Sequence, residues 1–222
     1  MPFSEYKNLG NAIKEFNLNY KEQVFEDVLL VEVPQNLVED IAFNLLELVY
    51  DGSEAIICET LIFPVLKEVW KEFRKELMLW SHQAIEWNAK LSGIPDYMFT
   101  KQSVLGKVVM DKPYLAVVEA KKDDFSAGWG QCTAEMYAVQ QINEKAGFYI
   151  DKKTGLQVDL MIFGIVCNGK VWEFASLQKN NFIKYTNIAD INNLKELYSL
   201  LRHILKSITN YELSITKKDV LK

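Results

Sequence analysis

The sequence predicts one compact domain of the α/β (α+β) class, with a mixed central sheet flanked by helices. Two apolar runs predict central strands. Residues 114–120 form a β-branched run opened by Pro113, and residues 160–167 form an uninterrupted apolar run, typical of a strand buried on both faces. Helical segments precede, separate and follow these strands. The core order is therefore α-β-β-α-β-β, which predicts a sheet covered by helices.

Residues 1–52 are expected to form an extension packed on the core domain, residues 53–222. Within the extension, residues 5–17 predict a short helix and residues 24–33 predict a strand after a linker. A second helix should begin at Pro34, because proline suits the first turn of a helix. This helix should continue along an apolar stripe that faces the core: Leu37, Ile41, Leu45 and Val49.

The core domain opens with a long helix. Ser53 is placed to cap this helix, which runs to about Glu76. Pro64 lies inside the helix, where it removes one backbone hydrogen bond and is expected to cause a kink. Residues 77–87 alternate partly between apolar and polar side chains, and we expect them to form an extended strand that leads to Asp96.

The second half of the core contains a helix, a hairpin and a last helix. The first helix starts near Ser126 and is bounded at its end by Gly147, Asp151 and Gly155. After the central strand, Asn168-Gly169 predicts a two-residue turn to a strand at residues 170–176. The last helix, residues 192–207, carries a wide apolar arc: Leu194, Leu197, Tyr198, Leu200, Leu201, Ile204, Leu205 and Ile208. So wide an arc indicates either burial in the core or an interface.

Composition limits the kinds of site that the chain can hold. The 222 residues are 49% hydrophobic, which supplies a sizeable core, and no apolar stretch is long enough to span a bilayer. The cysteines Cys58, Cys132 and Cys167 are widely spaced and indicate neither a disulfide framework nor a zinc site. Two histidines are too few for a histidine-rich metal site. The amino terminus lacks a signal-peptide pattern, so we expect a cytoplasmic protein.

A carboxylate and an ammonium end the first central strand. Because side chains alternate along a strand, Glu119 and Lys121 share one face, while Val118 and Ala120 point to the other. Such charges are expensive to bury unless they are paired or bind a metal. Asp96, at the head of another candidate strand, can supply a second carboxylate. Two carboxylates and a lysine around one point are what metal-assisted phosphodiester hydrolysis needs.

This arrangement resembles the PD-(D/E)-x-K nuclease superfamily, with Pro95-Asp96 followed after 22 intervening residues by Glu119-Ala120-Lys121. Three further segments resemble the amino-terminal nuclease domain of type I restriction-enzyme R subunits. They are the helix Ser53–Leu66, with an early glutamate before Leu-Ile-x-Pro-x-Leu, the strand Gly93–Tyr97, and the hairpin Val166–Phe174, with Asn-Gly-x-x-Trp-x-Phe. The resemblance covers roughly residues 53–176 and implies a restriction-endonuclease-like fold.

The resemblance implies a role for each residue of the motif. Asp96 and Glu119 would bind one Mg²⁺, or Mn²⁺ as a substitute, with the backbone carbonyl of Ala120 as a third protein ligand. Lys121 would orient or activate the attacking water, or offset charge in the transition state. From the residues alone, Asp96 could also be a turn residue, and Glu119 with Lys121 could be an edge-strand face that touches water.

Two helical residues complete the implied site. Glu54 would hold a water of the centre or a second cation, and Gln131 would position the lysine or the phosphate. The restriction-subunit family usually has Gln-x-x-x-Tyr on this helix, whereas here Gln131 and Tyr137 are six apart and Glu135 takes the next turn. Glu54 could also be a first-turn glutamate that interacts with the helix dipole, and Gln131 with Glu135 a solvated polar stripe. Packing, rather than base stacking, is expected of Trp80, His82 and Trp87.

The expected function is that of a metal-dependent nuclease, which hydrolyses phosphodiester bonds of nucleic acid, above all DNA. A net charge of −5 gives no global attraction to phosphates, so we expect weak autonomous DNA binding, or a partner protein that delivers the substrate. The acidic balance also leaves open a catalytically silent binding or assembly module on the same fold. Cutting both strands of a duplex needs two active sites, which predicts a homodimer held by the last helix or the amino-terminal region.

Overall fold

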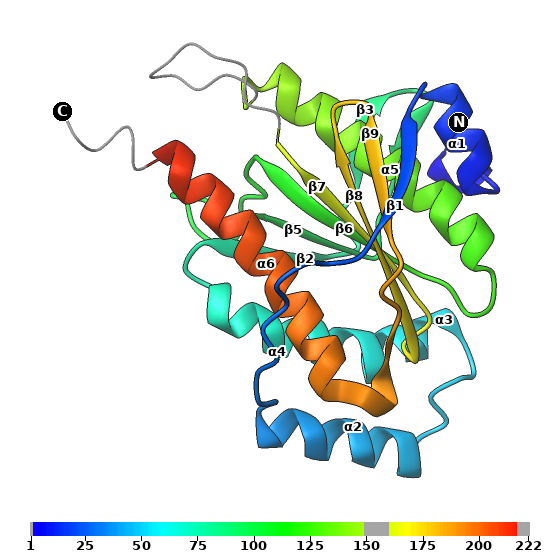
Figure 1. Cartoon of the computed structure of the whole chain (residues 1–222), viewed down its shortest axis with the longest axis vertical. Helices are drawn as coiled ribbons and strands as arrows, with labels where there is room; N and C mark the ends of the chain where they lie inside the picture. Colours follow the sequence, from blue (N-terminus) through cyan, green and yellow to red (C-terminus); the bar gives the residue numbers. More distant parts are fainter. Residues whose placement is uncertain (1, 149–159, 217–222) are drawn as a thin grey trace.

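The computed structural model describes residues 2–148 and 160–216 and has a mixed central sheet flanked by helices, as predicted (Figure 1). The order of the main sheet is β1-β9-β8-β7-β6-β5-β2, with β10 paired to β8. Its strands are β1 (Asn19–Gln23), β2 (Leu77–Ser81), β5 (Tyr97–Lys101), β6 (Tyr114–Ala120), β7 (Ile162–Cys167), β8 (Val171–Gln178), β9 (Asn181–Tyr185) and β10 (Ala189–Asp190). A separate two-stranded sheet consists of β3 (Ile85–Asn88) and β4 (Leu91–Gly93).

The main sheet contains parallel and antiparallel pairs. The parallel pairs are β6 with β7 and β1 with β9. Antiparallel pairs are formed by β2 with β5, β5 with β6, β7 with β8 and β8 with β9. A parallel pair needs a crossover connection, and α5 (Phe125–Lys145) supplies it between β6 and β7. β6 and β7 are buried along their whole length, as predicted for two central strands.

The crossover helix α5 confirms the helix that was predicted near Ser126. Asp124 caps it, because its side chain accepts a hydrogen bond from Ala127 N at 2.9 Å. Beyond its last residue, Gly147 has φ +85°, a left-handed conformation that suits glycine after a helix. The two other expected end markers, Asp151 and Gly155, lie outside the described residues.

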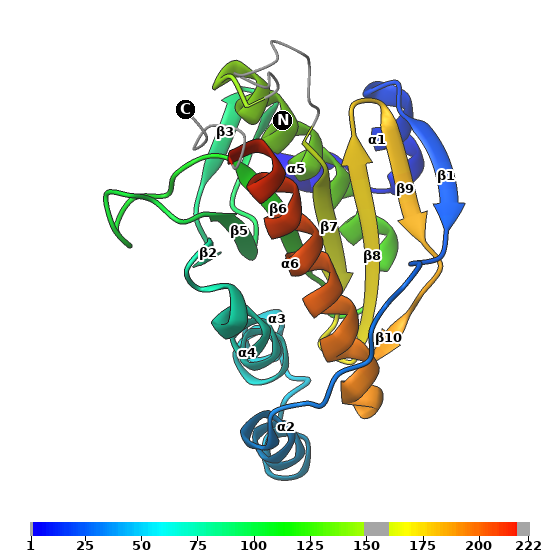
Figure 2. The same ribbon diagram turned by 60° about the vertical axis from the view of Figure 1, so that its left-hand side comes forward.

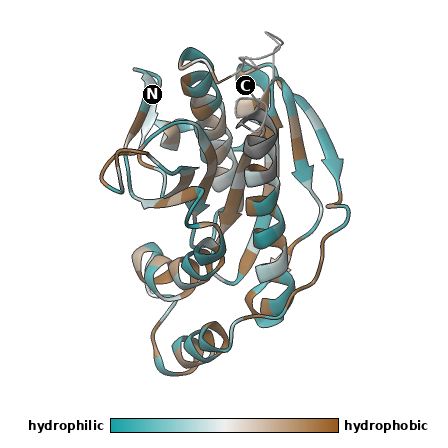
Figure 3. Cartoon of the chain, turned by 90° about the vertical axis from the view of Figure 1, so that its left-hand side faces the viewer, coloured by the Kyte–Doolittle hydropathy of each residue, from teal (hydrophilic) through white to brown (hydrophobic). Residues whose placement is uncertain are grey.

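Helices cover both faces of the sheet, each over its own apolar core (Figure 2). One face carries α5 together with η1 (Phe3–Glu5) and α1 (Leu9–Glu15). The other face carries α2 (Gln35–Glu47), α3 (Glu54–Ile57), η2 (Cys58–Ile62), α4 (Phe63–Phe73), η3 (Ile191–Asn193) and α6 (Leu194–Thr216). Hydrophobic residues concentrate on the strands between these layers (Figure 3). No helix of the described ranges combines the length and the apolar composition that crossing a membrane requires.

The amino-terminal extension differs from its prediction. Its first helix, α1, is shorter than expected, and the strand predicted at residues 24–33 is wrong, because the strand is β1, within the predicted linker. Phe25 and Val31 pack their side chains on the core, but their N–H groups donate to Asn187 Oδ1 at 2.7 Å and Ser199 Oγ at 3.0 Å. The apolar pattern of this segment therefore reflects packing on the core, whereas β1 is a polar, exposed edge strand.

The helices predicted from Pro34 and Ser53 are present, and the second of them is irregular. α2 follows Pro34 and buries Leu37 and Ile41 of its predicted stripe, but it ends at Glu47, so Val49 lies beyond the helix and is exposed. Ser53 caps α3, and η2 then widens into a π-helical segment directly before α4. Pro64 is the second residue of α4, which continues directly from η2. As predicted, the proline has no N–H to donate to Thr60 O, four residues earlier, and Asn44 Nδ2 donates to that oxygen at 2.7 Å. The predicted interruption next to this proline therefore takes the form of a π-helical segment.

The structure has more strands between α4 and α5 than the predicted core order contains. The single strand expected at residues 77–87 is divided into β2 and β3. β2 ends at Ser81, and His82 then adopts φ +50°, which turns the chain away before β3 begins. A positive φ is uncommon for a residue other than glycine, and the local sequence gives no sign of it.

The hairpin turn between β7 and β8 is displaced by one residue from its prediction. Asn168 N donates to Val171 O at 3.2 Å, which leaves Gly169 and Lys170 as the two turn residues. Gly169 takes φ +80°, a conformation that glycine adopts without strain. A Cβ at this position would approach Ile57 Cγ2 to 2.9 Å, so the turn packs closely against the start of the core helices.

The last helix belongs to the core. α6 buries the predicted apolar arc inside the chain at Leu197, Tyr198, Leu200, Leu201, Ile204, Leu205 and Ile208. Its polar contacts fix it to α4, where Glu72 accepts hydrogen bonds from Tyr198 Oη at 2.8 Å and Arg202 Nε at 2.7 Å. The expectation that this arc contributes a dimer contact is therefore wrong, because the sheet and the neighbouring helices already cover it.

Candidate active site

Asp96 and Glu119 lie at the same end of the neighbouring strands β5 and β6. The register pairs Tyr97 with Val118, so Asp96, one residue earlier, is opposite Glu119, one residue later. Residues directly opposite each other in an antiparallel pair share a face of the sheet. Asp96 Oδ2 also accepts a hydrogen bond from Ala120 N at 2.7 Å. The fold therefore brings the two predicted carboxylates together, and Asp96 is more than a turn residue.

Lys121 follows β6 on the same face as Glu119. Its Nζ lies 2.5 Å from Glu119 Oε1, and its backbone N–H donates to Cys167 O at 2.9 Å. The alkyl chain lies against α5 at Gly128, where an added Cβ would be 3.0 Å from Lys121 Cγ and 2.8 Å from Val166 Cγ1. Glycine at this position leaves room for the lysine. The predicted alternation is confirmed, and the edge-strand alternative is wrong because β6 is central and buried.

Burial governs the ionisation of these groups. Only 1% of Glu119 is exposed, and this burial, followed by the charge of Asp96, raises the pKa of its carboxyl to about 7. Burial also raises the pKa of Asp96, although the Ala120 N–H and Lys121 oppose the change. Burial alone would lower the pKa of Lys121, but the surrounding carboxylates, with Glu119 first, raise it above its usual value. The lysine therefore stays charged at neutral pH, while Glu119 titrates near neutrality.

Glu135 of α5 is a buried neighbour of Glu119. The two carboxyl groups interact closely enough to influence each other's ionisation, and burial raises the pKa of Glu135 well above its usual value. Gln131 Nε2 donates to Glu135 Oε1 at 3.3 Å. In the described part of the chain, neither Glu119 Oε2 nor Glu135 Oε2 receives a hydrogen bond. One proton shared between the two carboxyls would satisfy both atoms. Because Glu135 is fully buried, the solvated stripe considered for it is wrong.

The helical residues Glu54 and Gln131 lie on opposite sides of this cluster. Glu54, in the first turn of α3, accepts a hydrogen bond from Lys122 N at 3.3 Å and interacts electrostatically with Lys121. It therefore reaches the cluster from the amino-terminal end of its helix. The hydrogen bond of Gln131 goes to Glu135, so in this structure the glutamine holds the carboxyl pair and not the lysine.

The sequence did not identify His82 as a member of this cluster. Its Nε2 lies 3.4 Å from Asp96 Oδ1, and its Nδ1 lies 2.7 Å from Ser81 Oγ. The packing role expected for His82 is incomplete, because 56% of its side chain is exposed beside the carboxylates. Only the pairing of β2 with β5, which aligns Ser81 with Tyr97, brings it there, and no local pattern predicts that pairing.

The donor atoms suit a hard divalent cation. The carboxylates of Asp96 and Glu119 and the carbonyl of Ala120 provide oxygen, and Mg²⁺ needs few protein ligands because it keeps several waters. Within residues 2–148 and 160–216, no group of three His, Cys, Asp or Glu side chains is arranged so that it could hold a metal ion. The oxygen Glu119 Oε2 receives no hydrogen bond from these residues, and a cation would give it a charged partner. The fit to an ion therefore rests on the kind of donor atoms and on this unpartnered oxygen.

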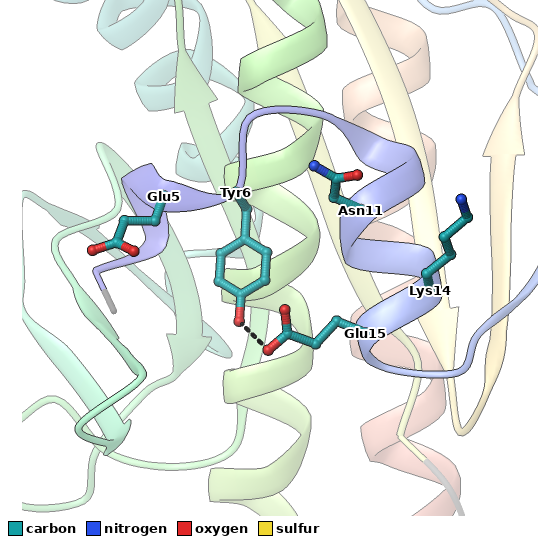
Figure 4. Close-up of a pocket in the computed structure, with 5 residues that line it drawn as sticks. All are labelled: Glu5, Tyr6, Asn11, Lys14 and Glu15. Atoms are coloured by element: carbon teal, nitrogen blue, oxygen red, sulfur yellow. Dashed lines mark hydrogen bonds between the residues drawn. The ribbon is translucent and has the colours of Figure 1, made fainter.

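A surface hollow of about 440 Å³ lies elsewhere, on the amino-terminal extension (Figure 4). Its lining is polar and consists of Glu5, Tyr6, Asn11, Lys14 and Glu15. Across it, Tyr6 Oη donates to Glu15 Oε1 at 3.1 Å, which ties the chain before α1 to the end of that helix. This bond gives the hollow a structural explanation, and the residues around Glu119 remain the cluster that carries chemistry.

Comparison with known proteins supplies no family that could assign a role to this cluster. No protein-family model matches the sequence, and no curated protein matches it. What the chain can do is therefore inferred from its own side chains and from the motifs in its sequence.

Proposed function

We propose that the protein is a metal-dependent nuclease that hydrolyses phosphodiester bonds of DNA. The observation that carries the proposal is the buried Glu119 with Lys121 at 2.5 Å and Asp96 on the opposite strand. A buried ion pair contributes little to stability once desolvation is counted, so folding alone gives little reason to place one in a central strand. Metal-assisted phosphoryl chemistry needs this combination of groups.

The order of elements around the cluster supports the same proposal. The hairpin β5–β6, the crossover α5 and the hairpin β7–β8 follow one another, with α3, η2 and α4 before them. A restriction-endonuclease-like core with the PD-(D/E)-x-K motif is expected to have this order, and the additional strands β2, β3 and β4 would decorate it. The motif residues lie at the end of β6 and before β5, where that core would hold them.

Each residue of the cluster has a distinct part in the proposed reaction. A bound Mg²⁺ would neutralise charge on the scissile phosphate and lower the barrier to attack by water. Asp96, Glu119 and the Ala120 carbonyl would hold that ion. Lys121 keeps its charge while buried, so its ammonium can orient the water or offset charge that develops in the transition state. Glu54, beside the lysine, would hold a water or a second cation.

One observation favours a second function, that of a silent binding or assembly module on the same fold. Glu119, the central carboxylate, already contacts Lys121 on one side and Glu135 on the other. A carboxyl that keeps the proton shared with Glu135 is a poor metal ligand, because cation binding requires the charged form. Such a module would bind its partner without hydrolysing it, and metal binding separates the two functions.

Cleavage of duplex DNA in the presence of Mg²⁺ or Mn²⁺ tests the proposal. We expect Lys121→Ala to lose turnover and keep metal binding, and Asp96→Ala and Glu119→Ala to lose both. Lys195→Ala is a matched control, because this lysine forms an exposed ion pair with Glu32 on the opposite side of the sheet. Equal cleavage by the wild type and all three site variants would identify a contaminating nuclease and remove the support for this site.

A further inference from the structure

His82 stands beside the proposed cation site, yet the proposed reaction makes no use of it. The pairing of Ser81 with Tyr97 brings it to the head of β5. There its backbone N–H donates to Asp96 O at 2.9 Å, and its Nε2 lies 3.4 Å from Asp96 Oδ1. Because more than half of the imidazole is exposed, it is accessible to an ion that enters from solvent.

The imidazole ring is held in a defined orientation. Its Nδ1 lies 2.7 Å from Ser81 Oγ, and the imidazole makes a T-shaped contact with the Tyr97 ring, with the centroids 5.9 Å apart. The backbone of His82 has φ +50°, which is uncommon for a residue other than glycine and persists where the surroundings determine it. The direction of Nε2 is therefore set by the fold.

The facing atoms leave a place for a cation between them. With the ring proton on Nδ1, where Ser81 Oγ can accept it, Nε2 keeps a lone pair and faces a carboxylate oxygen. Histidines that bind metals almost always donate their other ring proton to a carboxylate, a backbone carbonyl or water, and the Ser81 hydroxyl takes that position here. Consider two donor atoms that each lie about 2.1 Å from one cation. If the donor–cation–donor angle is a right angle or slightly wider, the two donors lie about 3.0–3.5 Å apart. The observed 3.4 Å falls within this range.

We propose that His82 Nε2 and Asp96 Oδ1 bind the same divalent cation, so that the site combines nitrogen and oxygen donors. This inference rests on the proposed function, because it concerns the cation of the same site. Imidazole is a good ligand for transition-metal ions, whereas Mg²⁺ prefers oxygen. The protein is therefore expected to bind Mn²⁺ and Co²⁺ more tightly than Mg²⁺.

Pulsed EPR on tag-free protein loaded with Mn²⁺ tests the nitrogen ligand directly, because a nitrogen-14 modulation reports an imidazole bound to the ion. The sequence contains two histidines, His82 and His203, so the signal can be assigned by substitution. His82→Asn removes the imidazole, and asparagine is among the residues that tolerate the positive φ of this position. The matched control is His203→Gln, which lies on α6 beside Phe25, on the other face of the sheet.

The expected result is a nitrogen signal in the wild type and in His203→Gln that is lost in His82→Asn. Calorimetry should show Mn²⁺ binding to His82→Asn weakened about tenfold or more, and Mg²⁺ binding weakened less. Metal-free thermal unfolding checks the fold, with His82→Gln as a second variant.

Three outcomes are separable. Bound Mn²⁺ without a nitrogen signal, or with a signal that persists in His82→Asn, overturns the role of His82 and leaves the carboxylate site intact. Absence of Mn²⁺ binding, or binding that Asp96→Ala does not weaken, overturns the proposed function together with this inference. Loss of the signal in His203→Gln alone would place the ion elsewhere on the chain and overturn both.

Discussion

Replacing Glu135 by glutamine tests the buried carboxyl pair without changing its shape. In the native protein Glu119 and Glu135 are buried neighbours, and burial raises the pKa of both carboxyls. A carboxyl whose pKa is raised in the folded state stabilises the fold fully below its unfolded pKa. That contribution is lost as the pH rises through the folded pKa. The metal-free wild type is therefore expected to lose stability from about pH 4.5 upwards through pH 7.

The size of the loss can be worked from Glu119. The pKa of this carboxyl is raised from 4.5 to about 7, and one unit corresponds to about 1.4 kcal/mol, which gives a loss of about 3 kcal/mol. Glu135 adds a loss of the same sign, because burial raises its pKa as well. A glutamine cannot ionise, and its amide can donate to the Glu119 carboxylate, which favours the charged form. We expect Glu135→Gln to be about 2–3 kcal/mol more stable than the wild type at pH 8, and similar to it at pH 5.

Urea unfolding in EDTA at steps from pH 5 to pH 8 measures both stability profiles. Thermal unfolding gives a second readout, because about 1 kcal/mol corresponds to roughly 2–4 °C in Tm for a domain of this size. Glu32→Gln is the matched control, since the ion pair of Glu32 with Lys195 is exposed and contacts neither carboxyl of the buried pair, so its loss should leave the pH slope unchanged. Parallel pH profiles for the wild type and Glu135→Gln would refute the shared-proton explanation.

Gly128→Ala would place a Cβ 2.8 Å from Val166 Cγ1 and 3.0 Å from Lys121 Cγ. Although alanine normally stabilises a helix by about 1 kcal/mol relative to glycine, this substitution should displace the lysine and reduce DNA cleavage at least tenfold. Unchanged cleavage kinetics would contradict this packing. Mg²⁺ or Mn²⁺ should raise the Tm of the wild type but not of Asp96→Ala, as calorimetric scans can check. Leu201→Ala should lower the free energy of unfolding by about 2–5 kcal/mol without changing the mass measured by light scattering; a change in oligomeric mass would place α6 in an interface.

The parts of the site that follow from local sequence were predictable. Alternation along an apolar strand is enough to place Glu119 and Lys121 on one face, because adjacent side chains of a strand point in opposite directions. The Asp124 cap and the apolar run of β7 likewise depend on neighbouring residues, and the helix and strand predicted there are present. The pattern Pro95-Asp96 predicts Asp96 as the second carboxylate, and the register of β5 with β6 places it opposite Glu119.

The remaining parts depend on contacts between distant segments. His82 reaches Asp96 only because β2 pairs with β5, and a left-handed φ at His82 has no signature in the sequence. Glu135 looked like a solvated residue, since a carboxyl on a helix is usually exposed, but α5 crosses the sheet directly over Glu119. β1 was missed because all of its side chains are exposed and none carries an apolar pattern, whereas residues 24–33 are apolar because Phe25, Val28, Val31 and Val33 pack on the core.

A crystal structure of the protein soaked in Mn²⁺, with anomalous diffraction at the manganese edge, tests the central claim most directly. The predicted result is one anomalous peak within bonding distance of the Asp96 and Glu119 carboxylates and the Ala120 carbonyl, with Glu119 Oε2 turned from Glu135 to the ion. No peak at this place at saturating Mn²⁺, with Glu119 still bound to Lys121 and Glu135, would contradict the claim that these residues form a nuclease centre.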